Sequence, residues 1–387
     1  MKKGISILGS TGSIGRQTLE VVSIFPSALT VVAMAAKDEV DLIVEQIKKF
    51  SPKLVSVESE AVKQKVEAKL GPSKVEIATG SEGLLRVATE PSAKLVVAAI
   101  PGSLSLLAVL EAVKAKKDIA LATKEVLVTA GDLFMQEVKA SGVKIFPIDS
   151  EHSAISQCLR GEDHKTIQKL IITASGGPFL KTPKEKFATL TAKDALAHPT
   201  WKMGPKITVD SATLMNKGLE IIEAHHLFGV AYDHIDVVVH PGSTVHSLVE
   251  FADGAMLAQM GTPDMRLPLQ YAINGQHHWP LDCGRLDLTA LGPLRFEKPD
   301  TERFPCLALA RAAGRVGGSA PVVLNAANEI AVAALLAGHI RFTDIGAVVA
   351  EALAREPDHL VPDLVAVLET DRRARALAET IVHERSR

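Results

Sequence analysis

The feature that most constrains the fold is a short apolar run followed by a glycine loop at the start of the chain. Gly4 to Leu8 predicts a strand, residues 9–15 read GSTGSIG, and Thr18 to Ile24 carries a helical apolar pattern. In this order, glycines let backbone N–H groups approach a pyrophosphate, and the helix N-terminus attracts its charge. The spacing GxxGxxG alone is a weak signal, because a glycine turn can also serve only to pack a helix on a strand.

The alternation of strand-length and helical runs continues to about residue 149. Strands are expected at 30–36, 53–57, 94–99, 119–122 and 143–148, and helices at 42–49, 104–115 and 133–139. Strands that alternate with helices favour a parallel, doubly wound sheet. We therefore expect residues 1–149 to form an α/β, Rossmann-like domain that binds a dinucleotide.

The pattern changes after residue 149. Residues 150–275 contain strand-like runs at 170–173, 236–239, 245–251 and 256–260, which indicate a central α+β domain. Residues 276–300 are rich in Pro, Gly and charge and are expected to be a surface linker. Residues 301–387 carry helical patterns with helix start and stop signals, which predict a C-terminal helical bundle.

Composition excludes several classes of protein. A net charge of −2 over 387 residues gives no electrostatic case for binding nucleic acid or a membrane. No apolar run approaches the ~20 residues of a membrane span, and the N-terminal run is too short for a signal peptide. Cys158, Cys283 and Cys306 lack a CxxC pattern, which is typical of reduced thiols in a cytoplasmic protein.

Two carboxylates follow the expected strand 143–148, which ends in Asp149-Ser150-Glu151-His152. If the extended conformation persists, Asp149 and Glu151 point to the same side, at the strand end where α/β sheets place their sites. The alternative is a capping box in which Asp149 or Ser150 starts a helix. The two interpretations are compatible, because one carboxylate can cap while others bind.

The stretch from residue 198 to 223 reads HPTWKMGPKITVDSATLMNKGLEIIE. Its first part predicts a loop, because Pro199, Gly204 and Pro205 lie too close together for a helix or strand. From Ala212 the apolar spacing predicts a helix, which is expected to begin near Ser211.

On this expected helix, Asn216, Lys217 and Glu220 fall opposite the apolar stripe, on one polar face. A solvated face of an ordinary amphipathic helix is the alternative interpretation. Together with Asp149 and Glu151, Glu220 would give three oxygen ligands, a set that suits Mg²⁺ or Mn²⁺ and not zinc.

Two further polar residues carry weaker signals. Ser175 precedes Gly176 and Gly177 after the strand 170–173, and it could belong to a plain turn or to a phosphate-binding nest. His246 lies in the strand 245–251, where a single histidine is more often a core residue.

The motifs of the chain resemble those of the 1-deoxy-D-xylulose 5-phosphate reductoisomerase family over essentially its whole length. In order they read GSTGSIG, ATKE, PIDSEHSAI, ASGGPF, HPTWKMG, DSATLMNKGLE and PGSTVHS. The resemblance implies an NADPH- and divalent-metal-dependent oxidoreductase that converts 1-deoxy-D-xylulose 5-phosphate to 2-C-methyl-D-erythritol 4-phosphate for isoprenoid synthesis. It also implies a cytoplasmic homodimer, and the apolar strand 256–260 is a candidate interface.

The resemblance assigns roles to individual residues. The metal ligands are Asp149, Glu151 and Glu220. The substrate-binding residues are Lys124, Ser150, Glu151, Ser175, His198, Ser211, Asn216, Lys217, Glu220 and His246. The catalytic residues are Lys124, Glu151 and His198, with Trp201 and Met203 on a loop that closes over the substrate. The NADPH site comprises Gly9, Thr11, Gly12, Ser13, Ile14, Lys37, Thr123, Glu125 and Gly204.

The chain departs from the family pattern at several positions. Thr123 stands where the family usually has asparagine, so a contact to the cofactor is lost or is replaced by a hydroxyl, and Gly242 replaces a glutamine in a loop. Lys37, after the second strand, favours a 2′-phosphate. Asp38 and Glu39 come next. At these two positions the family commonly has a basic or small polar residue and then asparagine. Acidic groups repel a phosphate, so NADPH is inferred and the strength of its preference over NADH stays open.

Two other functions remain as alternatives. A semialdehyde dehydrogenase would require a nucleophilic cysteine in a site motif, and none of the three cysteines has one. A non-catalytic NADPH-binding regulator would not need the three carboxylates, and an assay of metal dependence would separate it from an enzyme.

Overall fold

The structure is a computed structural model, and it describes residues 2–102, 105–201 and 203–386. Leu104, where one helix was expected to start, and Lys202 of the expected loop lie outside these residues. The chain divides into two compact units. Unit 1 comprises Met1–Val126, Phe134–Ser153 and Asp264–Cys283, and unit 2 comprises Leu127–Leu133, Ala154–Pro263 and Gly284–Arg387.

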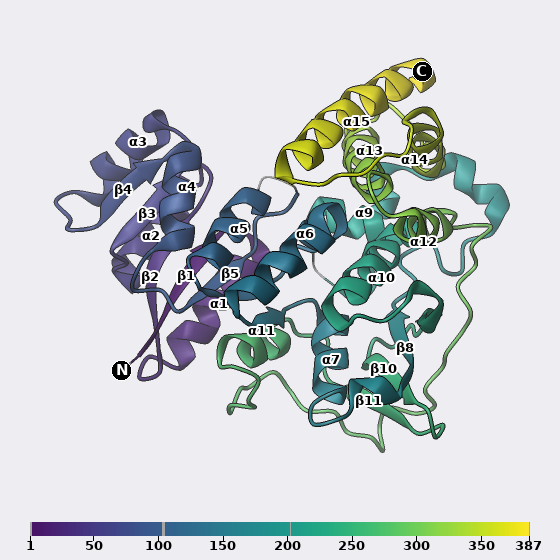
Figure 1. Ribbon diagram of the computed structural model, residues 1–387, viewed down its shortest axis with the longest axis horizontal. Coiled ribbons are helices and arrows are strands. Elements are labelled where there is room, and N and C mark those ends of the chain that lie inside the picture. The colour runs from purple at the N-terminus through teal and green to yellow at the C-terminus, as the bar shows by residue number, and fades with distance from the viewer. Residues whose placement is uncertain (1, 103–104, 202, 387) are drawn as a thin grey trace. The chain divides into compact units, whose positions relative to one another are not determined.

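Unit 1 is built on a parallel sheet, as the sequence predicted (Figure 1). Its strands are β1 (Lys3–Leu8), β2 (Leu29–Ala35), β3 (Leu54–Val57), β4 (Glu76–Thr79), β5 (Leu95–Ala98), β6 (Asp118–Leu121) and β7 (Ile145–Pro147). In the described residues their order is β4-β3-β2-β1-β5-β6-β7, and every pairing is parallel. Strands β2, β3 and β4 lie on one side of β1, and β5, β6 and β7 lie on the other, so the strand order reverses between β1 and β5. Parallel sheets bind ligands at such a switch point.

Helices accompany this sheet. They are α1 (Ser13–Ile24), α2 (Val40–Phe50), α3 (Glu60–Leu70), α4 (Gly80–Thr89), α5 (Leu106–Lys114), α6 (Glu125–Ser141) and α11 (Arg266–Ile273), with 127–133 of α6 counted in unit 2. Of these helices, α1, α2, α3 and α11 bury apolar residues in the core of the sheet. In α2, Ile43, Val44 and Ile47 are buried in the unit 1 core, while Lys48 and Lys49 lie in the last turn, where they complement the helix dipole.

The chain ranges of the units differ from the expected boundaries at 149 and 275. Residues 264–283 belong to unit 1, because Leu269 and Ile273 of α11 complete its apolar core and Arg266 pairs with Glu20 at 2.6 Å. The helices of the C-terminal part of the chain belong to unit 2. A separate domain over residues 301–387, and a linker over 276–300, stay predictions.

Unit 2 contains a second, mixed sheet, whose strands match the strand-like runs that the sequence predicted for an α+β domain. Its strands are β8 (Ile167–Ala174), β9 (Ile235–Val239), β10 (Val245–Phe251) and β11 (Met256–Met260), in the order β11-β10-β8-β9 among the described residues. Strands β8 and β9 are parallel, and the other pairs are antiparallel.

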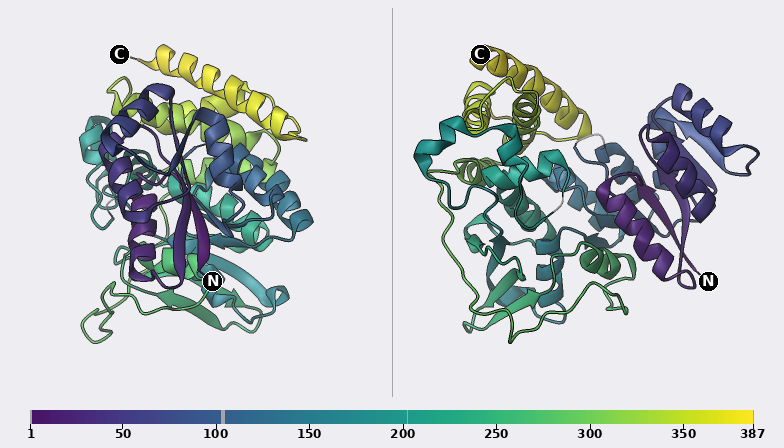
Figure 2. Two further views of the ribbon diagram at one scale, coloured as in Figure 1. Left: turned by 90° about the vertical axis from the view of Figure 1, so that its left-hand side faces the viewer. Right: turned by 180° about the vertical axis from the view of Figure 1, so that it is seen from behind.

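The helices of unit 2 enclose its core together with this sheet. They are α7 (Ser150–Cys158, which starts in unit 1), α8 (Ala192–Ala195), α9 (Pro205–Thr213), α10 (Met215–Phe228), α12 (Cys306–Val316), α13 (Ala320–Leu336), α14 (Asp344–Arg355) and α15 (Leu364–Arg385). Helix α15, yellow in Figure 2, lies along α13 and α14. Helix α10 packs against β8 and β9 and also against α12, where Gly218 allows close approach to Ala310.

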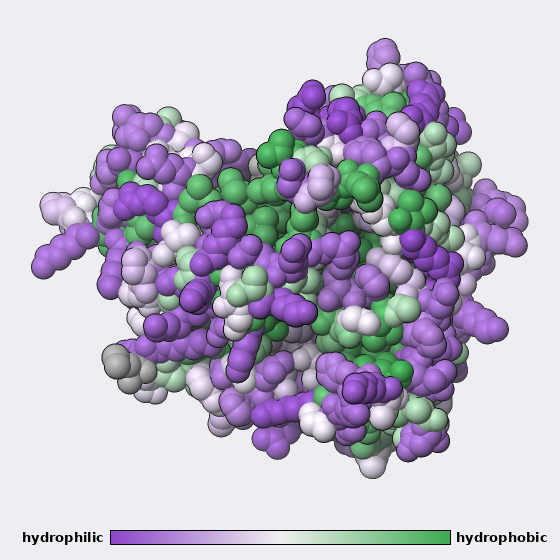
Figure 3. Space-filling model, in the orientation of Figure 1, coloured by the Kyte–Doolittle hydropathy of each residue, from purple (hydrophilic) through white to green (hydrophobic). Residues whose placement is uncertain are grey.

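The surface is mainly hydrophilic on the face that can be seen, which agrees with the lack of long apolar runs in the sequence. Hydrophilic side chains dominate the face seen in Figure 3, interspersed with smaller apolar areas. Within residues 2–102, 105–201 and 203–386, none of the helices combines the length and apolar character needed to cross a membrane.

Candidate functional site

The glycine loop of unit 1 has the geometry of a phosphate cradle. Gly9 has a φ of +92°, and a Cβ on Gly15 would lie 2.1 Å from the carbonyl oxygen of Gly9, so both positions require glycine. Gly12 differs, because a Cβ there would meet only that same oxygen, at 3.4 Å. Gly12 caps α1 without a side-chain hydrogen bond, so the N-terminus of α1, which starts at Ser13, is open to an anion.

Thr123, which departs from the family pattern, holds the backbone near this cradle. Its hydroxyl donates to the carbonyl oxygen of Ile100 at 2.7 Å, and also to that of Ala98 at 3.3 Å. The side chain is buried, as is Glu125 at the start of α6. The Thr123 hydroxyl therefore supports the loop after β5.

The carboxylates of Asp149 and Glu151 lie together in unit 1, although not on an extended strand. Strand β7 ends at Pro147 and α7 begins at Ser150, so the extended alternative is wrong and the helix-start alternative is correct. The carbonyl oxygen of Asp149 accepts the N–H of Ser153 at 2.8 Å, which starts the helix. One oxygen atom of Asp149 and one of Glu151 are nevertheless within 4.8 Å of each other.

Both carboxylates have polar neighbours that hold them in place. The ammonium of Lys124, which is itself buried, donates to Asp149 Oδ2. The hydroxyl of Ser150 donates to Glu151 Oε2 at 2.6 Å. Unit 1 thus brings together Lys124, Asp149, Ser150 and Glu151 from the ends of β6 and β7, which is where parallel sheets place their sites.

In unit 2, the stretch expected to form one helix from Ser211 forms two. Helix α9 starts at Pro205, a favoured first helical position for proline, and α10 starts at Met215. Between them Leu214 adopts the left-handed conformation with φ +60°, at a cost of about 1–2 kcal/mol for a non-glycine residue. The break gives α10 an N-terminus of its own, and Asn216 and Lys217 lie in its first turn, where an anion is favoured.

The polar residues of α10 are buried, so the solvated-face interpretation is wrong. Asn216 is 8% exposed, Lys217 6% and Glu220 0%, because the sheet and α12 cover the helix from different sides. Glu220 Oε1 accepts from the Asn216 amide at 2.5 Å, and its Oε2 accepts from the Lys217 ammonium at 2.7 Å. Burying charges is costly unless they are paired, and this arrangement offsets that cost.

His198 joins two hydroxyls to the loop that follows it. Its Nε2 lies 3.0 Å from Ser175 Oγ and 3.1 Å from Ser211 Oγ. Its Nδ1 accepts the backbone N–H groups of Thr200, at 3.1 Å, and Trp201, at 2.9 Å. An Nδ1 that accepts two hydrogen bonds carries no proton, so Nε2 carries the proton and donates toward the serines. Burial, and then the charge of Lys217, lower the pKa of His198, which favours the neutral ring.

This arrangement predicts a pH dependence for the loop. Because the folded-state pKa of His198 is lowered, the neutral ring stabilises the fold above its unfolded value near 6.5, and this contribution is lost as the pH falls through the folded-state pKa. We expect KM for the substrate to rise as the pH falls through this lowered folded-state pKa, because the ring then gains a second proton. His198→Asn, whose amide oxygen replaces the Nδ1 acceptor, should remove most of this pH dependence.

The matched variant His198→Gln, whose amide extends to the Nε2 position, should instead keep the contact to Ser175 and Ser211 and lose the hydrogen bonds to the loop. KM profiles against pH for both variants check the assignment. If both variants kept the wild-type dependence of KM on pH, the assignment of this dependence to His198 would be contradicted.

The turn after β8 holds Ser175 against α9. Gly176 and Gly177 have positive φ, and a Cβ on Gly177 would lie 2.8 Å from the carbonyl oxygen of Ser211. The N–H of Gly177 donates to Ser175 Oγ at 3.2 Å. The two glycines therefore permit the close approach that brings Ser175 and Ser211 to the same imidazole.

The loop before α9 lies against His246. The Trp201 ring is half-buried, with its centroid 6.2 Å from that of His246, which is buried in β10. Met203 is half-buried, and Gly204 is exposed and caps α9. Sequence patterns alone left His246 as a core residue, because its aromatic neighbour comes from a distant loop.

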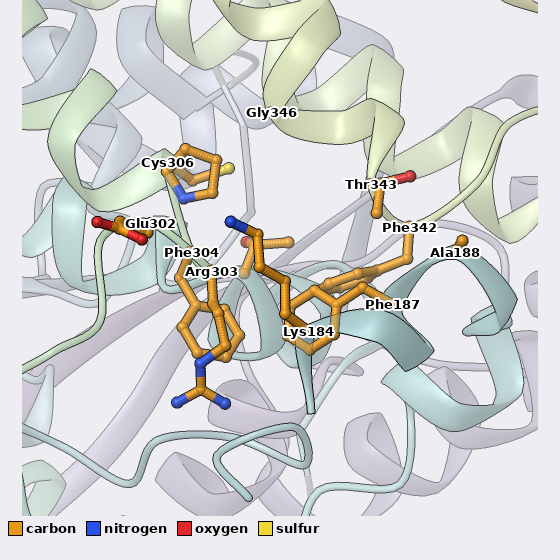
Figure 4. A pocket seen from close by; sticks show the side chains of 12 residues that line it. Lys184, Phe187, Ala188, Glu302, Arg303, Phe304, Cys306, Phe342, Thr343 and Gly346 are labelled. Carbon is orange, nitrogen blue, oxygen red and sulfur yellow. The ribbon is translucent and has the colours of Figure 1, made fainter. Parts of the chain in front are cut away.

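Sequence reasoning did not find a separate pocket in unit 2 of about 320 Å³ (Figure 4). Its lining includes Lys184, Phe304 and the rings of Phe187 and Phe342, whose centroids are 5.9 Å apart. None of the site residues expected from the sequence lines it. The aromatic residues come from segments far apart in the chain, so no local pattern could reveal it.

The cysteines do not supply a nucleophile. Burial raises the pKa of Cys158 to about 11 and those of Cys283 and Cys306 to about 12. Such thiols stay protonated near neutral pH and are poor nucleophiles. This disfavours the semialdehyde dehydrogenase alternative.

These features define a class of protein: an oxidoreductase with a Rossmann-type dinucleotide domain and a second unit that gathers hydroxyls, a lysine and a carboxylate for an anionic substrate. Family models agree. One described as 1-deoxy-D-xylulose 5-phosphate reductoisomerase matches residues 5–131, and its C-terminal domain model matches 145–228. A model described as DXP reductoisomerase C-terminal domain matches 260–377. The chain belongs to the 1-deoxy-D-xylulose 5-phosphate reductoisomerase family.

Individual relatives match over nearly their full lengths. The chain is 51% identical to the 1-deoxy-D-xylulose 5-phosphate reductoisomerase of Desulforamulus reducens, covering 99% of both chains. It is 39% identical to the solved enzyme from Zymomonas mobilis in complex with NADPH, with a TM-score of 0.92 and 99% of both chains covered. It is 40% identical to a solved DOX-P reductoisomerase in complex with NADPH, fosmidomycin and magnesium, with a TM-score of 0.92 and 98% of both chains covered.

Proposed function

We propose that the chain converts 1-deoxy-D-xylulose 5-phosphate to 2-C-methyl-D-erythritol 4-phosphate with NADPH and a divalent metal ion, as a step of non-mevalonate isoprenoid synthesis. The observation that carries this proposal is the 51% identity over 99% of a curated reductoisomerase. The buried residues of α10 support it, because an ordinary helix face has no need of a buried ammonium–carboxylate pair.

We propose that unit 2 binds the phosphate group of the substrate. Ser175 and Ser211 present hydroxyls, and Asn216 and Lys217 add an amide and an ammonium at the N-terminus of α10. Charge-assisted hydrogen bonds of this kind are roughly twice as strong as neutral ones. Binding energy gained at the phosphate would orient the reacting carbons, which lie elsewhere in the substrate.

Asp149, Glu151 and Glu220 are proposed to hold the metal ion. The donor set fits a hard cation, because all three offer carboxylate oxygens and the first two lie within 4.8 Å of each other. A bound Mg²⁺ or Mn²⁺ would polarise the ketone and fix the neighbouring hydroxyl of the substrate. Lys124 and Ser150 hold the two carboxylates of unit 1 in place and are proposed to contact the sugar backbone.

The NADPH site is proposed to centre on the glycine loop. Gly9, Gly12 and the N-terminus of α1 at Ser13 would bind the pyrophosphate, with Ile14 and Thr11 along the same loop. Lys37 would contact the 2′-phosphate, and Glu125 and Gly204 are further candidates. NADPH supplies the hydride that reduces the rearranged aldehyde.

The reaction itself is the test of this function. Metal-free enzyme should oxidise NADPH only when both 1-deoxy-D-xylulose 5-phosphate and Mg²⁺ or Mn²⁺ are added, with 2-C-methyl-D-erythritol 4-phosphate as the product identified by NMR. We propose that both ions support turnover. Metal-independent turnover, or tight NADPH binding with no turnover, would favour another function such as the regulator.

Trp201 should be required for turnover but not for folding. We propose that the loop carrying Trp201 and Met203 closes over the substrate and keeps water from the reactive intermediate. Trp201→Ala should then fold normally and lose turnover by about 100-fold, since misplacing a substrate-positioning group can cost this much.

Trp279 provides the control. It packs against Phe25 in unit 1, with ring centroids 4.7 Å apart. Trp279→Phe should keep its turnover and leave Trp201 as the single indole, whose fluorescence should change when substrate binds with NADPH. Unchanged kinetics in Trp201→Ala, together with unchanged fluorescence, would make Trp201 ordinary packing.

We also propose that the chain is a cytoplasmic homodimer that pairs through β11. This strand is an edge of its sheet, and Met256 and Leu257 are 53% and 42% exposed. Exposed apolar edge strands invite pairing with another chain. Light scattering should give a dimer at micromolar concentration, and Leu257→Glu should weaken it. Leu360→Glu, at a residue 84% exposed elsewhere in unit 2, should not. A wild-type monomer would contradict the proposal.

A further inference from the structure

The segment after β2 carries two acidic residues and one lysine, which is an unusual set of charges for a chain that binds NADPH. After Ala35 the sequence reads Ala36-Lys37-Asp38-Glu39, and α2 starts at Val40. In a Rossmann-type sheet this position meets the adenosine ribose of the dinucleotide. The residues here therefore decide between a 2′-hydroxyl and a 2′-phosphate.

Hydrogen bonds fix Glu39 next to the glycine loop. The Thr11 hydroxyl donates to Glu39 Oε2 at 2.8 Å. Ser10 and Gln46 exchange two buried hydrogen bonds, of 2.7 and 2.9 Å, which tie α2 to the same loop. The backbone N–H groups of residues 9 and 10 also donate to the carbonyl oxygen of Ala35, at the end of β2. Glu39 is thus held beside the glycine loop, in the region where Rossmann-type sheets bind the ribose of a dinucleotide.

The second carboxylate oxygen of Glu39 is available to a ligand. Within the part of the chain that the structure describes, Oε1 accepts no hydrogen bond, and the side chain is exposed. An acidic side chain at this position commonly accepts a hydrogen bond from a ribose 2′-hydroxyl. The geometry of Glu39 therefore suits a hydroxyl ligand.

The surrounding charges disfavour a 2′-phosphate. Lys37 is the cation of this segment, and its ammonium already lies 3.9 Å from Glu58. Asp38 and Glu39 are both exposed beside it. A phosphate bound by Lys37 would meet repulsion from these carboxylates, whereas a hydroxyl would not. One lysine thus offsets only part of the local negative charge.

We infer that Glu39 accepts a hydrogen bond from the adenosine 2′-hydroxyl of NADH, and that the chain uses NADH as a second hydride donor beside NADPH. The inference rests on the proposed reaction and extends it to a second coenzyme. NADH transfers a hydride to the aldehyde carbon and becomes NAD⁺, and the resulting alkoxide takes a proton from solvent. Lys37 remains the contact for the 2′-phosphate of NADPH.

Equilibrium binding to the full chain, without substrate, tests this directly. The fluorescence of the reduced nicotinamide gives Kd for NADPH and NADH, and kcat/KM is measured with each coenzyme. For the wild type we expect the two Kd values to lie within about tenfold of each other. Glu39→Ala should weaken NADH about tenfold or more and leave NADPH unchanged or tighter, and Lys37→Ala should weaken only NADPH by a similar factor.

Asp41→Ala is the matched control. Asp41 is an exposed carboxylate in the first turn of the same helix, and it pairs with Lys69 instead of the glycine loop. Its loss should change neither Kd. A wild-type Kd for NADH more than about tenfold above that for NADPH would overturn the inference, as would equal effects of Glu39→Ala on both coenzymes. Because binding is measured without substrate, an absence of turnover would count against the proposed reaction, and the Kd values would still decide this inference.

Discussion

Replacing Glu220 with glutamine is expected to lower turnover at least about a thousandfold while the chain still folds and binds NADPH. Glutamine keeps the shape of the side chain and can still accept from Asn216 through its amide oxygen. It removes one of the negative charges proposed to hold the metal ion. It also removes the carboxylate that pairs with the buried Lys217 ammonium at 2.7 Å, so the free energy of unfolding should fall as well. Loss of electrostatic stabilisation in a buried site typically costs 10²–10³ in turnover, and loss of the ion itself costs more.

The comparison variant is Glu250→Gln, which removes a half-buried carboxylate from β10 in the same unit. It should leave turnover and metal affinity within about twofold of the wild type, as expected for a substitution away from the site. Metal affinity is measured by titration with Mn²⁺. If Glu220→Gln kept wild-type affinity for Mn²⁺ and wild-type turnover, Glu220 would not be a metal ligand.

Replacing Lys217 with alanine is expected to damage both substrate binding and stability. KM should rise by about two orders of magnitude or more, because removing one partner of a buried charge-assisted contact costs about 2–5 kcal/mol. The free energy of unfolding should fall by about 3–5 kcal/mol, because Glu220, which is fully buried, would lose the ammonium 2.7 Å from its Oε2.

The double variant Lys217→Ala/Glu220→Gln separates the two effects. It no longer contains the buried carboxylate that lost its ammonium partner, so it should regain much of the lost stability, and the interaction energy between the two substitutions should be large. Substrate binding should stay weak, because the ammonium is still missing. Recovery of substrate binding in the double variant would mean that Lys217 serves only the fold.

The sequence was most informative where apolar periodicity is strong. Strands β1, β2, β3, β5 and β6 follow from short apolar runs, because burial on both faces of a sheet demands them. The strands of the unit 2 sheet also follow from apolar runs, although β9 alternates between buried and half-buried residues and β11 is largely exposed. Strand β4 and helices α3 and α4 were missed. In α3 only Val62 and Val66 are buried, and β4 buries only Ile77, so their patterns are too sparse to separate from a loop.

The candidate site was predictable by residue type and less so by conformation. The break between α9 and α10 was missed because Leu214, and not glycine or proline, adopts the left-handed conformation there. The burial of Asn216, Lys217 and Glu220 was missed because α12, which covers their helix, lies far along the chain. The hydrogen bonds of His198 to Ser175 and Ser211 could not be predicted, because only the folded structure brings these three residues together.

The most direct measurement is the position of the metal ion in crystals of the full chain grown with Mn²⁺, NADPH and a substrate analogue, located by anomalous scattering. We expect a single ion bound by one carboxylate oxygen from each of Asp149, Glu151 and Glu220, with any remaining ligands being oxygens of the analogue or water. An ion bound without Glu220, or through the imidazole of His152, would contradict this expectation.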